Sequence, residues 1–219
     1  DEILGSEKES YERGFDEFNR ISVFRTLSNT FRLYMDGLLE YKFIDKVEKT
    51  DVIDESEAFE EAAKFIETKK SLLKGVEIYL SDVVNNGSYY TFSFDYKFEG
   101  VPVFFNEYFS STRDKTTLNH AVVIKANSTR VLECYWILKD FSNGNEKVVL
   151  KVNNFAELME EAVGTYKELS SKGSYVIKDI SISYAVVHSD DSQTLKPVWF
   201  IETINGKNYV IPMLEKGAN

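Results

Sequence analysis

Two histidines are the first candidates for chemistry in this chain, because imidazole transfers protons near neutral pH and binds metal ions. His120 and His188 lie in separate apolar runs that are typical of strands. His188 is followed by Asp190 and Asp191, the nearest approach to a cluster of metal ligands in the sequence. A metal site needs several such ligands at fixed spacing. We therefore predict the polar end of a hairpin there, and no metal site.

Other reactive side chains are better explained by the fold than by catalysis. Cys134 lies in the apolar run VLECYWIL with no base beside it, so a buried thiol is predicted. The pairs Glu60-Glu61 and Glu160-Glu161 lie in helical runs close to lysines, where solvent exposure is the ordinary state. The GxSxG, HExxH, P-loop and GxGxxG motifs are all absent from the sequence. We predict no catalytic residue, no cofactor and no enzyme activity.

Aromatic side chains alternate with polar ones along one strand-like run. This period-two pattern is typical of a strand with one buried face. A row of rings could hold a flat cofactor, but the helical run just before this strand offers a simpler partner. We predict that the aromatic face packs against that helix; its members are Tyr90, Phe92, Phe94, Tyr96 and Phe98.

The charge of the chain disfavours one whole class of partners. Its 219 residues include 26 basic and 36 acidic side chains, which gives a formal net charge of −10. Binding to nucleic acid or to an anionic lipid surface requires a concentrated basic face. The densest basic group is Lys69-Lys70 with Lys74, which we interpret as a solvated helix face. We therefore expect a protein partner and no nucleic acid.

Cysteine content and the start of the chain bear on the compartment. A single cysteine excludes an intramolecular disulfide, and it is compatible with the cytosol or with an extracytoplasmic face that uses few cysteines. No run of about 18 apolar residues is present that could span a membrane. Because the chain starts at Asp1 without methionine, we expect that a signal or anchor helix was removed, although tag cleavage leaves the same start.

The helices and strands that must position these side chains follow from the apolar pattern. Residues 56–73 have helical spacing, with Ser56 or Asp54 as the N-cap and Gly75 as the stop. Strand-like pieces fill the stretch from Val76 to Phe105, which turns at Asn86-Gly87 and at Glu99-Gly100. A helix followed by a meander is therefore predicted in the middle of the chain.

The same order of elements recurs near the C-terminus. A helix is predicted over residues 154–171, and strands over 175–189, 195–204 and 207–212, the last two joined by the hairpin turn Asn205-Gly206. We therefore predict an α+β fold made of two tandem helix-plus-antiparallel-sheet repeats. The predicted domains are residues 1–141, an N-terminal hairpin plus the first repeat, and residues 142–219, the second repeat.

The remaining segments have simpler predictions. Asp1 to Asp16 is acidic and is expected to be loosely ordered. A hairpin is predicted over residues 30–44 around Asp36-Gly37, an exposed loop over 107–119, and strands over 120–126 and 130–141.

Three strand–turn–strand stretches resemble pieces of a known family. They read TFRLYMDGLLEYKF, YTFSFDYKFEGVPVFF and LKPVWFIETINGKNYVIP. They are similar to segments of the YycH/YycI-type regulatory proteins, which are extracytoplasmic proteins of low-GC Gram-positive bacteria with one N-terminal membrane helix. The last stretch also resembles the closing hairpin of PepSY modules, through Pro197, Trp199, Ile201, Asn205, Gly206 and Tyr209.

The resemblance implies regulation rather than a reaction. It implies a membrane-anchored protein on the extracytoplasmic face that modulates a sensor histidine kinase of a two-component system through protein–protein contacts. The kinase itself, or a paralogous regulator, would be the partner. The family's membrane helix has no counterpart in this sequence. No catalytic residue carries over, because the family has none.

Two other functions stay open from the sequence. A hydrolase could use scattered carboxylates in a cleft between the two repeats, and convergent acids with displaced pKa values in a deep pocket would identify it. An inhibitor or carrier could act by strand addition at an edge such as Val101 to Phe105, where Pro102 lacks an amide donor.

Overall fold

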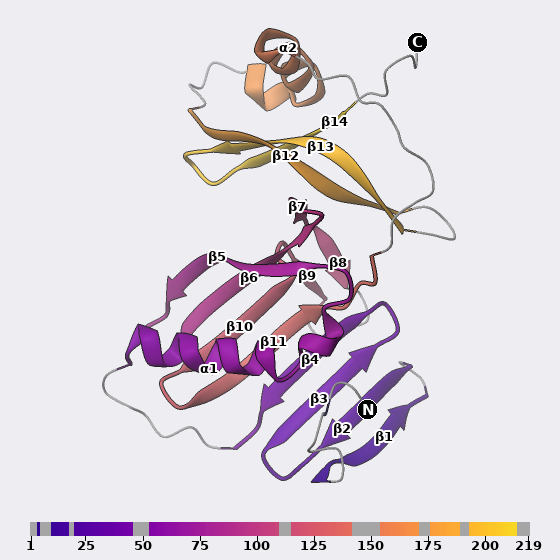
Figure 1. The fold of residues 1–219 in the computed structure, drawn as a ribbon, viewed down its shortest axis with the longest axis vertical. Helices are drawn as coiled ribbons and strands as arrows, with labels where there is room; N and C mark the ends of the chain where they lie inside the picture. Colours follow the sequence, from indigo (N-terminus) through magenta and orange to yellow (C-terminus); the bar gives the residue numbers. More distant parts are fainter. Residues whose placement is uncertain are drawn as a thin grey trace. The chain divides into compact units, whose positions relative to one another are not determined.

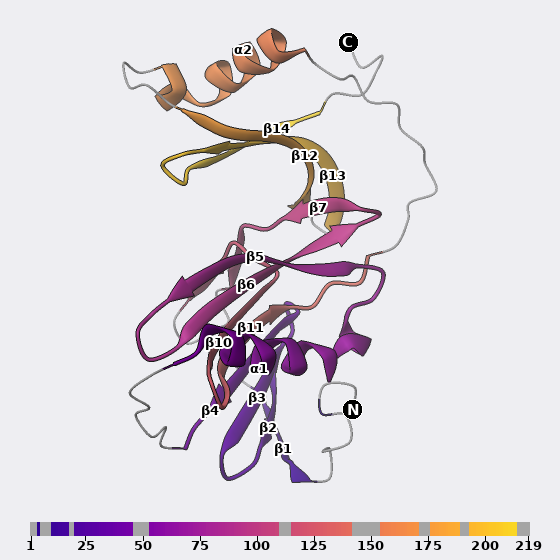
Figure 2. The same cartoon turned by 60° about the vertical axis from the view of Figure 1, so that its left-hand side comes forward.

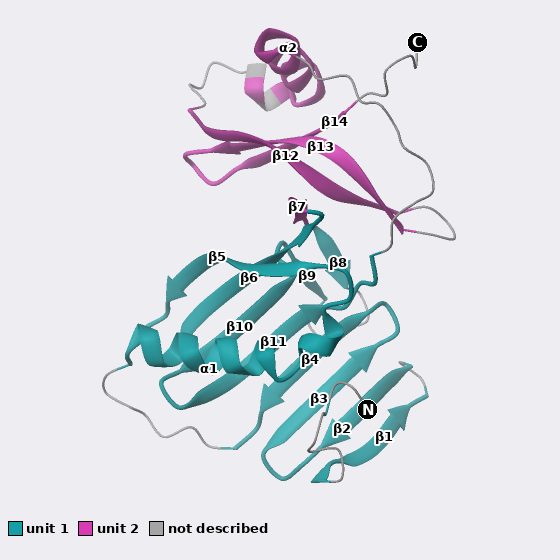
Figure 3. Cartoon of the chain, in the orientation of Figure 1, with its two compact units in different colours: residues 1–99, 105–142 teal, residues 100–104, 143–219 magenta. Residues whose placement is uncertain are grey.

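The computed structural model describes residues 4, 10–17, 20–45, 53–109, 115–141, 154–170, 176–188 and 193–213. Contacts within the chain divide it into two compact units (Figure 3). Unit 1 contains residues 1–99 and 105–142, and unit 2 contains residues 100–104 and 143–219. The chain therefore leaves unit 1 for five residues, returns to it, and then completes unit 2.

Unit 1 is an antiparallel sheet with a helix on one face (Figure 1). It begins as a meander and continues through β11, β10 and β6 to β5, so that strands distant in sequence become neighbours. Two short strands, β8 and β9, pair with each other in a separate ribbon. The strands of unit 1 are β1 (Glu12–Asp16), β2 (Ile21–Arg25), β3 (Asn29–Tyr34), β4 (Leu38–Phe43), β5 (Glu77–Asn85), β6 (Tyr90–Phe98), β8 (Glu107–Phe109), β9 (Thr116–Leu118), β10 (Val122–Asn127) and β11 (Arg130–Ile137).

Helix α1 (Glu55–Glu67) covers part of this sheet and is followed by the short 3-10 helix η2 (Lys70–Leu72). Asp54 caps it, because its carboxylate accepts the Glu57 amide at 3.0 Å. Alanines at positions 58 and 62 and Ile66 are buried beneath the helix, where small side chains permit close packing. The helix is shorter than predicted, since it ends at Glu67 rather than near Leu73.

The aromatic face of β6 packs under α1, as the sequence predicted. Phe59 of the helix contacts Phe92 at a centroid distance of 5.6 Å and Phe94 at 6.5 Å. Deeper in the core, the indole Nε1 of Trp136 donates to the Tyr96 hydroxyl at 2.6 Å, and that hydroxyl donates to the carbonyl of Ile137 at 2.9 Å. The two bonds satisfy the polar atoms of two fully buried rings, which would otherwise destabilise the core.

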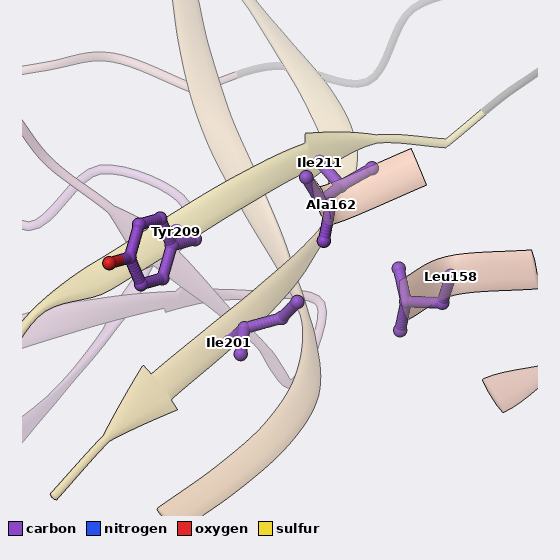
Figure 4. Close-up of a cluster of buried hydrophobic side chains, with 5 residues drawn as sticks. All are labelled: Leu158, Ala162, Ile201, Tyr209 and Ile211. Atoms are coloured by element: carbon purple, nitrogen blue, oxygen red, sulfur yellow. The ribbon is translucent and has the colours of Figure 1, made fainter. Parts of the chain in front are cut away.

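Unit 2 is a smaller sheet with helix α2 packed against it (Figure 2). Leu158 and Ala162 of α2 lie over Ile201, Tyr209 and Ile211 of the strands and form its buried core (Figure 4). Asn154 caps α2, as predicted. The elements are β7 (Val101–Phe104), α2 (Phe155–Thr165), η3 (Lys167–Ser170), β12 (Ile177–His188), β13 (Gln193–Thr203) and β14 (Asn208–Pro212).

The predicted fold of two tandem α+β repeats is wrong. Traced by hydrogen bonding, twelve of the described strands form one mixed sheet, in the order β1-β2-β3-β4-β11-β10-β6-β7-β12-β13-β14 with β5 beside β6, and two α-helices accompany them. The first predicted repeat is not self-contained, because β6 pairs with the distant β10 and its third strand, β7, pairs in parallel with β12. Three strands could not bury the aromatic face of β6 alone.

Three local predictions are also corrected. Residues 12–16 were expected to be loosely ordered, but they form β1. The expected loop over 107–119 contains the β8–β9 ribbon. Residues 101–105 were expected to form an edge, yet Val103 and Phe104 pair with Tyr184 and Ala185 of β12, and the carbonyl of Pro102 accepts the Ser183 hydroxyl at 2.8 Å. Because β12 occupies this strand, strand addition there is excluded.

The β3–β4 turn depends on a glycine for two reasons. Gly37 has φ +87°, a left-handed conformation that other residues adopt at a cost. A Cβ at this position would lie 2.8 Å from the carbonyl oxygen of Leu138, whose amide donates to the Gly37 carbonyl at 2.7 Å. Gly87, in the β5–β6 turn, has a similar φ of +81°, but no described atom lies within 4 Å of the position that a Cβ would take there.

We predict that Gly37→Ala lowers the free energy of unfolding by about 2–3 kcal/mol, because backbone strain and a steric contact act together. Gly87→Ala is the matched control and should cost only about 1 kcal/mol, the strain alone. Urea denaturation followed by circular dichroism measures both values. Equal losses in the two variants would contradict the close approach at Leu138.

Candidate functional site

His120 lies beside a bulge in β5, on the sheet face opposite the aromatic rings. Its Nδ1 is 2.9 Å from Oδ2 of Asp95, and the other oxygen of Asp95 accepts the Ala121 amide at 3.1 Å. The hydroxyl of Ser81, the residue at the register shift of β5, is 3.3 Å from the same Nδ1. Sequence reasoning missed this group, because its members come from three separate segments.

The Ser81, His120 and Asp95 side chains do not form a nucleophilic triad. In a triad the serine and the carboxylate contact different ring nitrogens, so that the proton moves across the imidazole. Here both contact Nδ1, and the Ser81 hydroxyl donates to the carbonyl of Ser93 at 3.0 Å. The arrangement therefore ties the bulge of β5 and the start of β10 to β6, which is a structural function.

Protonation strengthens this cluster. The hydrogen bond to Asp95 raises the pKa of His120, burial opposes that shift, and the charges of Asp95 and Asp82 reinforce it. Burial and the charge of Asp95 also raise the pKa of the neighbouring Tyr79. The charged imidazolium is thus favoured beside the carboxylate, and a neutral imidazole is a weaker partner.

The other predicted candidates do not converge on this cluster or on one another. Cys134 is fully buried, as predicted, and burial raises the pKa of its thiol, so it is unreactive. His188 ends β12, with Nδ1 3.1 Å from Nε2 of Gln193, while Asp190 and Asp191 lie outside the described residues. Among the residues that the structure describes, no group of three or more His, Cys, Asp or Glu side chains could hold a metal.

The helix-borne charges have mixed outcomes. Glu60 and Glu160 are exposed, and Glu61 and Glu161 are half-buried. The prediction of a solvated basic face holds for Lys70 and Lys74, which are exposed, but not for Lys69. The Lys69 ammonium lies over the rings of Phe31 at 5.2 Å and Phe65 at 4.6 Å. This cation–π contact fixes the end of the helical segment over the sheet.

A row of alternating charges that the sequence did not reveal crosses four strands. Glu40 accepts from Arg32 at 3.0 Å, and Lys42 and Lys125 approach Glu133 at 3.5 and 2.7 Å. Burial raises the pKa of Glu133, but the bonds and charges of Lys125 and Lys42 outweigh it, so the net shift is downward. These cross-strand pairs join β3, β4, β11 and β10 in the observed register.

A buried ion pair was also missed. Glu107 and Lys139 approach to 3.5 Å, with only 8% and 10% of their side chains exposed. A signal was present, because Phe105, Glu107 and Phe109 alternate and must share one face of the strand. Removing either charge would deprive the other of this ion pair at a buried position, which is destabilising.

A groove of about 480 Å³ lies between the start of α1 and strand β5. Its apolar walls are Phe59, Leu80, Val83 and the buried ring of Phe92. The N-cap Asp54 and the first helical residue, Glu55, form its acidic end, with Ser56 beside them. The groove combines an apolar lining with charge. Its size is within the range of ligand and peptide sites.

Comparisons with known proteins do not assign the chain to a family. No protein-family model matches it, and no curated protein matches it. An uncharacterized protein from Eubacterium rectale is 15% identical over 97% of this chain and 75% of its own, with a TM-score of 0.46. The C-terminal domain of YpeB from Bacillus megaterium is 12% identical over 92% of this chain and 88% of its own, with a TM-score of 0.42. The resemblance to YycH/YycI-type proteins stays a prediction.

The described helices bear on the predicted membrane anchor. None of them is long and apolar enough to cross a bilayer. The predicted anchor therefore stays an expectation from the sequence.

The PepSY-like positions Ile201 and Tyr209 are buried in the core of unit 2, and Gly206 has the left-handed φ of +76° that its turn requires. These positions serve the fold of unit 2.

We predict that His120→Gln destabilises the protein in a pH-dependent way. The pKa of His120 is raised on folding, so its stabilising contribution is complete below the unfolded value of about 6.5 and is lost as pH rises through the folded value. Urea denaturation at about pH 5.5 and about pH 9 should therefore show a larger difference between wild type and variant at the lower pH.

The carboxylate partner provides the control for this measurement. In an Asp95→Asn background, His120→Gln should lose most of its pH dependence, because the charge that favours the imidazolium is gone. A stability difference that is the same at both pH values in the wild-type background would contradict the assignment.

Proposed function

We propose that this chain is a non-enzymatic, protein-binding regulatory domain of the extracytoplasmic face of a bacterial membrane, and that it modulates a sensor histidine kinase. The observation that carries the proposal is the groove beside β5, which joins an apolar lining to a strand edge that no second described strand covers. Such a combination is suited to binding polypeptide. The sequence resemblance to YycH/YycI-type proteins supplies the class of partner.

Reactive side chains among the described residues are engaged in structural contacts, which supports a non-enzymatic role. The Ser81 hydroxyl donates to a main-chain carbonyl, the Cys134 thiol is fully buried, and Glu107 is paired with Lys139. Each of these groups has a structural function that catalysis would disturb. A general acid, base or nucleophile must instead be free to meet a substrate.

The hydrolase alternative lacks a favouring observation in the groove. Two carboxylates line it, those of Asp54 and Glu55. Asp54 already accepts the Glu57 amide as the helix cap, and Glu55 is exposed at the helix start. A hydrolytic pair would need both acids directed at one substrate atom. The inhibitor or carrier alternative loses its proposed edge, because β7 is paired with β12.

Net charge supports a protein over the other classes of macromolecule. At −10, the chain would be repelled by nucleic acid and by anionic lipid headgroups. The extracytoplasmic surface of a Gram-positive cell is reached by the sensor regions of membrane kinases, which makes such a region an accessible partner. Membrane attachment, in this proposal, comes from an N-terminal anchor and not from the described surface.

We predict that the purified chain changes the autophosphorylation rate of one sensor histidine kinase. Each membrane sensor kinase of the source organism, reconstituted in lipid nanodiscs, is assayed with increasing concentrations of the chain. Regulation by binding should change the rate saturably by about fivefold or more, the usual size of coupling between sites. Serum albumin at the same concentration serves as the control protein.

Two results would overturn the proposal. A set of kinases that all keep their basal rate would remove the regulatory role. Turnover of a panel of peptide, ester and glycoside reporter substrates, lost on heat unfolding of the chain, would remove the non-enzymatic assignment. Either result leaves the structural description of the groove intact.

A further inference from the structure

Strand β5 forms one edge of the unit 1 sheet. Among the described residues it pairs only with β6, over nine residues from Glu77 to Asn85. The Asn86 amide donates to the Tyr89 carbonyl, so these two residues form a hydrogen-bonded pair next to the turn. Hydrogen-bonded and non-hydrogen-bonded pairs then alternate along β5 and β6. In an antiparallel ladder, Val84 then bonds to β6, while the main-chain groups of Val83 and Asn85 point to the free side. These donors and acceptors can accept another strand.

The groove lies directly on this edge. Helix α1 packs over β6, β10 and β11, so the helix-side face of β5 is only partly covered (Figure 1). Leu80 and Val83 pair in register with Phe94 and Phe92, and all four side chains therefore lie on the helix side. Leu80 is 41% exposed although it is apolar. A strand added to the edge of β5 would place its helix-side side chains beside Val83 and, beyond the bulge at Ser81, beside Leu80.

Acidic side chains lie at one end of the groove and on the opposite face of β5. Asp54 and Glu55 form its helical end. On the opposite face of β5, Glu77 and Asp82 are exposed. A carboxylate-terminated or acidic segment would be repelled here, whereas lysine or arginine side chains would be attracted. Charge and alternation together define a segment with aliphatic residues on one face and basic residues on the other.

The other edges differ from β5. At the edge of unit 2, the hydroxyl of Tyr166 is 2.9 Å from the Val210 carbonyl oxygen and 3.3 Å from the Val210 amide nitrogen, so it occupies the outer main-chain groups of β14. Strand β1 has the sequence ERGFD, in which charged residues flank a glycine, a composition that discourages pairing. Strand β5 is longer than both and has a groove beside it.

We propose that β5 binds an extended segment of a protein partner by antiparallel strand addition, with aliphatic side chains in the groove and basic side chains toward the acidic residues. The occupant is thus a basic, alternating β-strand segment. This inference rests on the proposed protein-binding function and assigns its site. A groove between a helix and an edge strand gives main-chain bonds for affinity and side-chain pockets for specificity.

The inference is tested with a labelled hexapeptide of alternating lysine and valine and with the 219-residue chain, by fluorescence anisotropy. We expect saturable binding that weakens as salt is added. Leu80→Asn should weaken it by about tenfold, the effect of losing one aliphatic contact. Leu27→Asn is the matched control, because Leu27 is fully exposed outside the groove, and it should leave binding unchanged.

Charge is tested on the face of β5 opposite the groove, where the lysines of an added strand would lie. Glu77→Gln should weaken binding of the lysine–valine peptide, whereas Glu60→Gln, the same change on an exposed residue of α1, should not. A hexapeptide of alternating glutamate and valine should not bind. Equal effects of the two substitutions would show that the peptide responds to net charge alone and would overturn the proposal.

Strand addition itself is tested with two N-methylated peptides of identical composition. N-methylation of the valines removes the donors that face β5 in an antiparallel pair, and N-methylation of the lysines removes those on the far side. We expect the first peptide to lose binding and the second to keep it. Equal affinities of the two would exclude antiparallel addition.

The outcomes separate this inference from the proposed function. A kinase that responds equally to the wild-type chain and to the Leu80→Asn variant, together with absent peptide binding, would overturn the β5 site and leave the regulatory role. Peptide binding with the expected variant effects, but no responding kinase, would leave the site and overturn the role.

Discussion

The burial of one aromatic strand face governs the architecture of unit 1. Strand β6 presents Tyr90, Phe92, Phe94 and Tyr96 to a single side, and all four are at least nine-tenths buried. A row of rings this large requires a helix above it and strands on both sides of it, because each ring removes a large apolar area from water. Helix α1, β5 and β10 supply those neighbours, and β10 brings β11 and the N-terminal meander with it.

The same core explains the polar and glycine constraints around the end of β11. The buried Tyr96–Trp136 hydrogen bond ends on the Ile137 carbonyl, so the strand must follow a fixed path there. Beyond the strand, the carbonyl oxygen of Leu138 lies 2.8 Å from the position that a Cβ would take on Gly37. The carbonyl oxygen of Phe141 lies at the same distance from that position on Gly75. Two turns that are distant in sequence therefore close on one segment, and only glycine allows the approach.

Local structure could be predicted from the sequence, whereas pairing between distant segments could not. Asp54 and Asn154 begin the helices as expected, because a cap depends on neighbours within a few residues. A period of two reports which side chains share a face, but not which strand becomes the neighbour. The pairings of β4 with β11 and of β7 with β12 were therefore missed, and with them the fold class.

The cluster of Ser81, Asp95 and His120 was missed for the same reason, since the β5 bulge and the β6–β10 register bring its members together.

The acidic residues at the β5 edge bear on which strands that edge would pair with. An unpaired strand with apolar side chains pairs readily with a second copy of itself. On β5, Glu77 and Asp82 are exposed beside Leu80, and Asp54 and Glu55 stand at the end of the groove. Two such edges would bring like charges together, whereas a basic strand would neutralise them. The carboxylates would therefore disfavour pairing between two β5 edges, and the basic strand that we propose would meet no such repulsion.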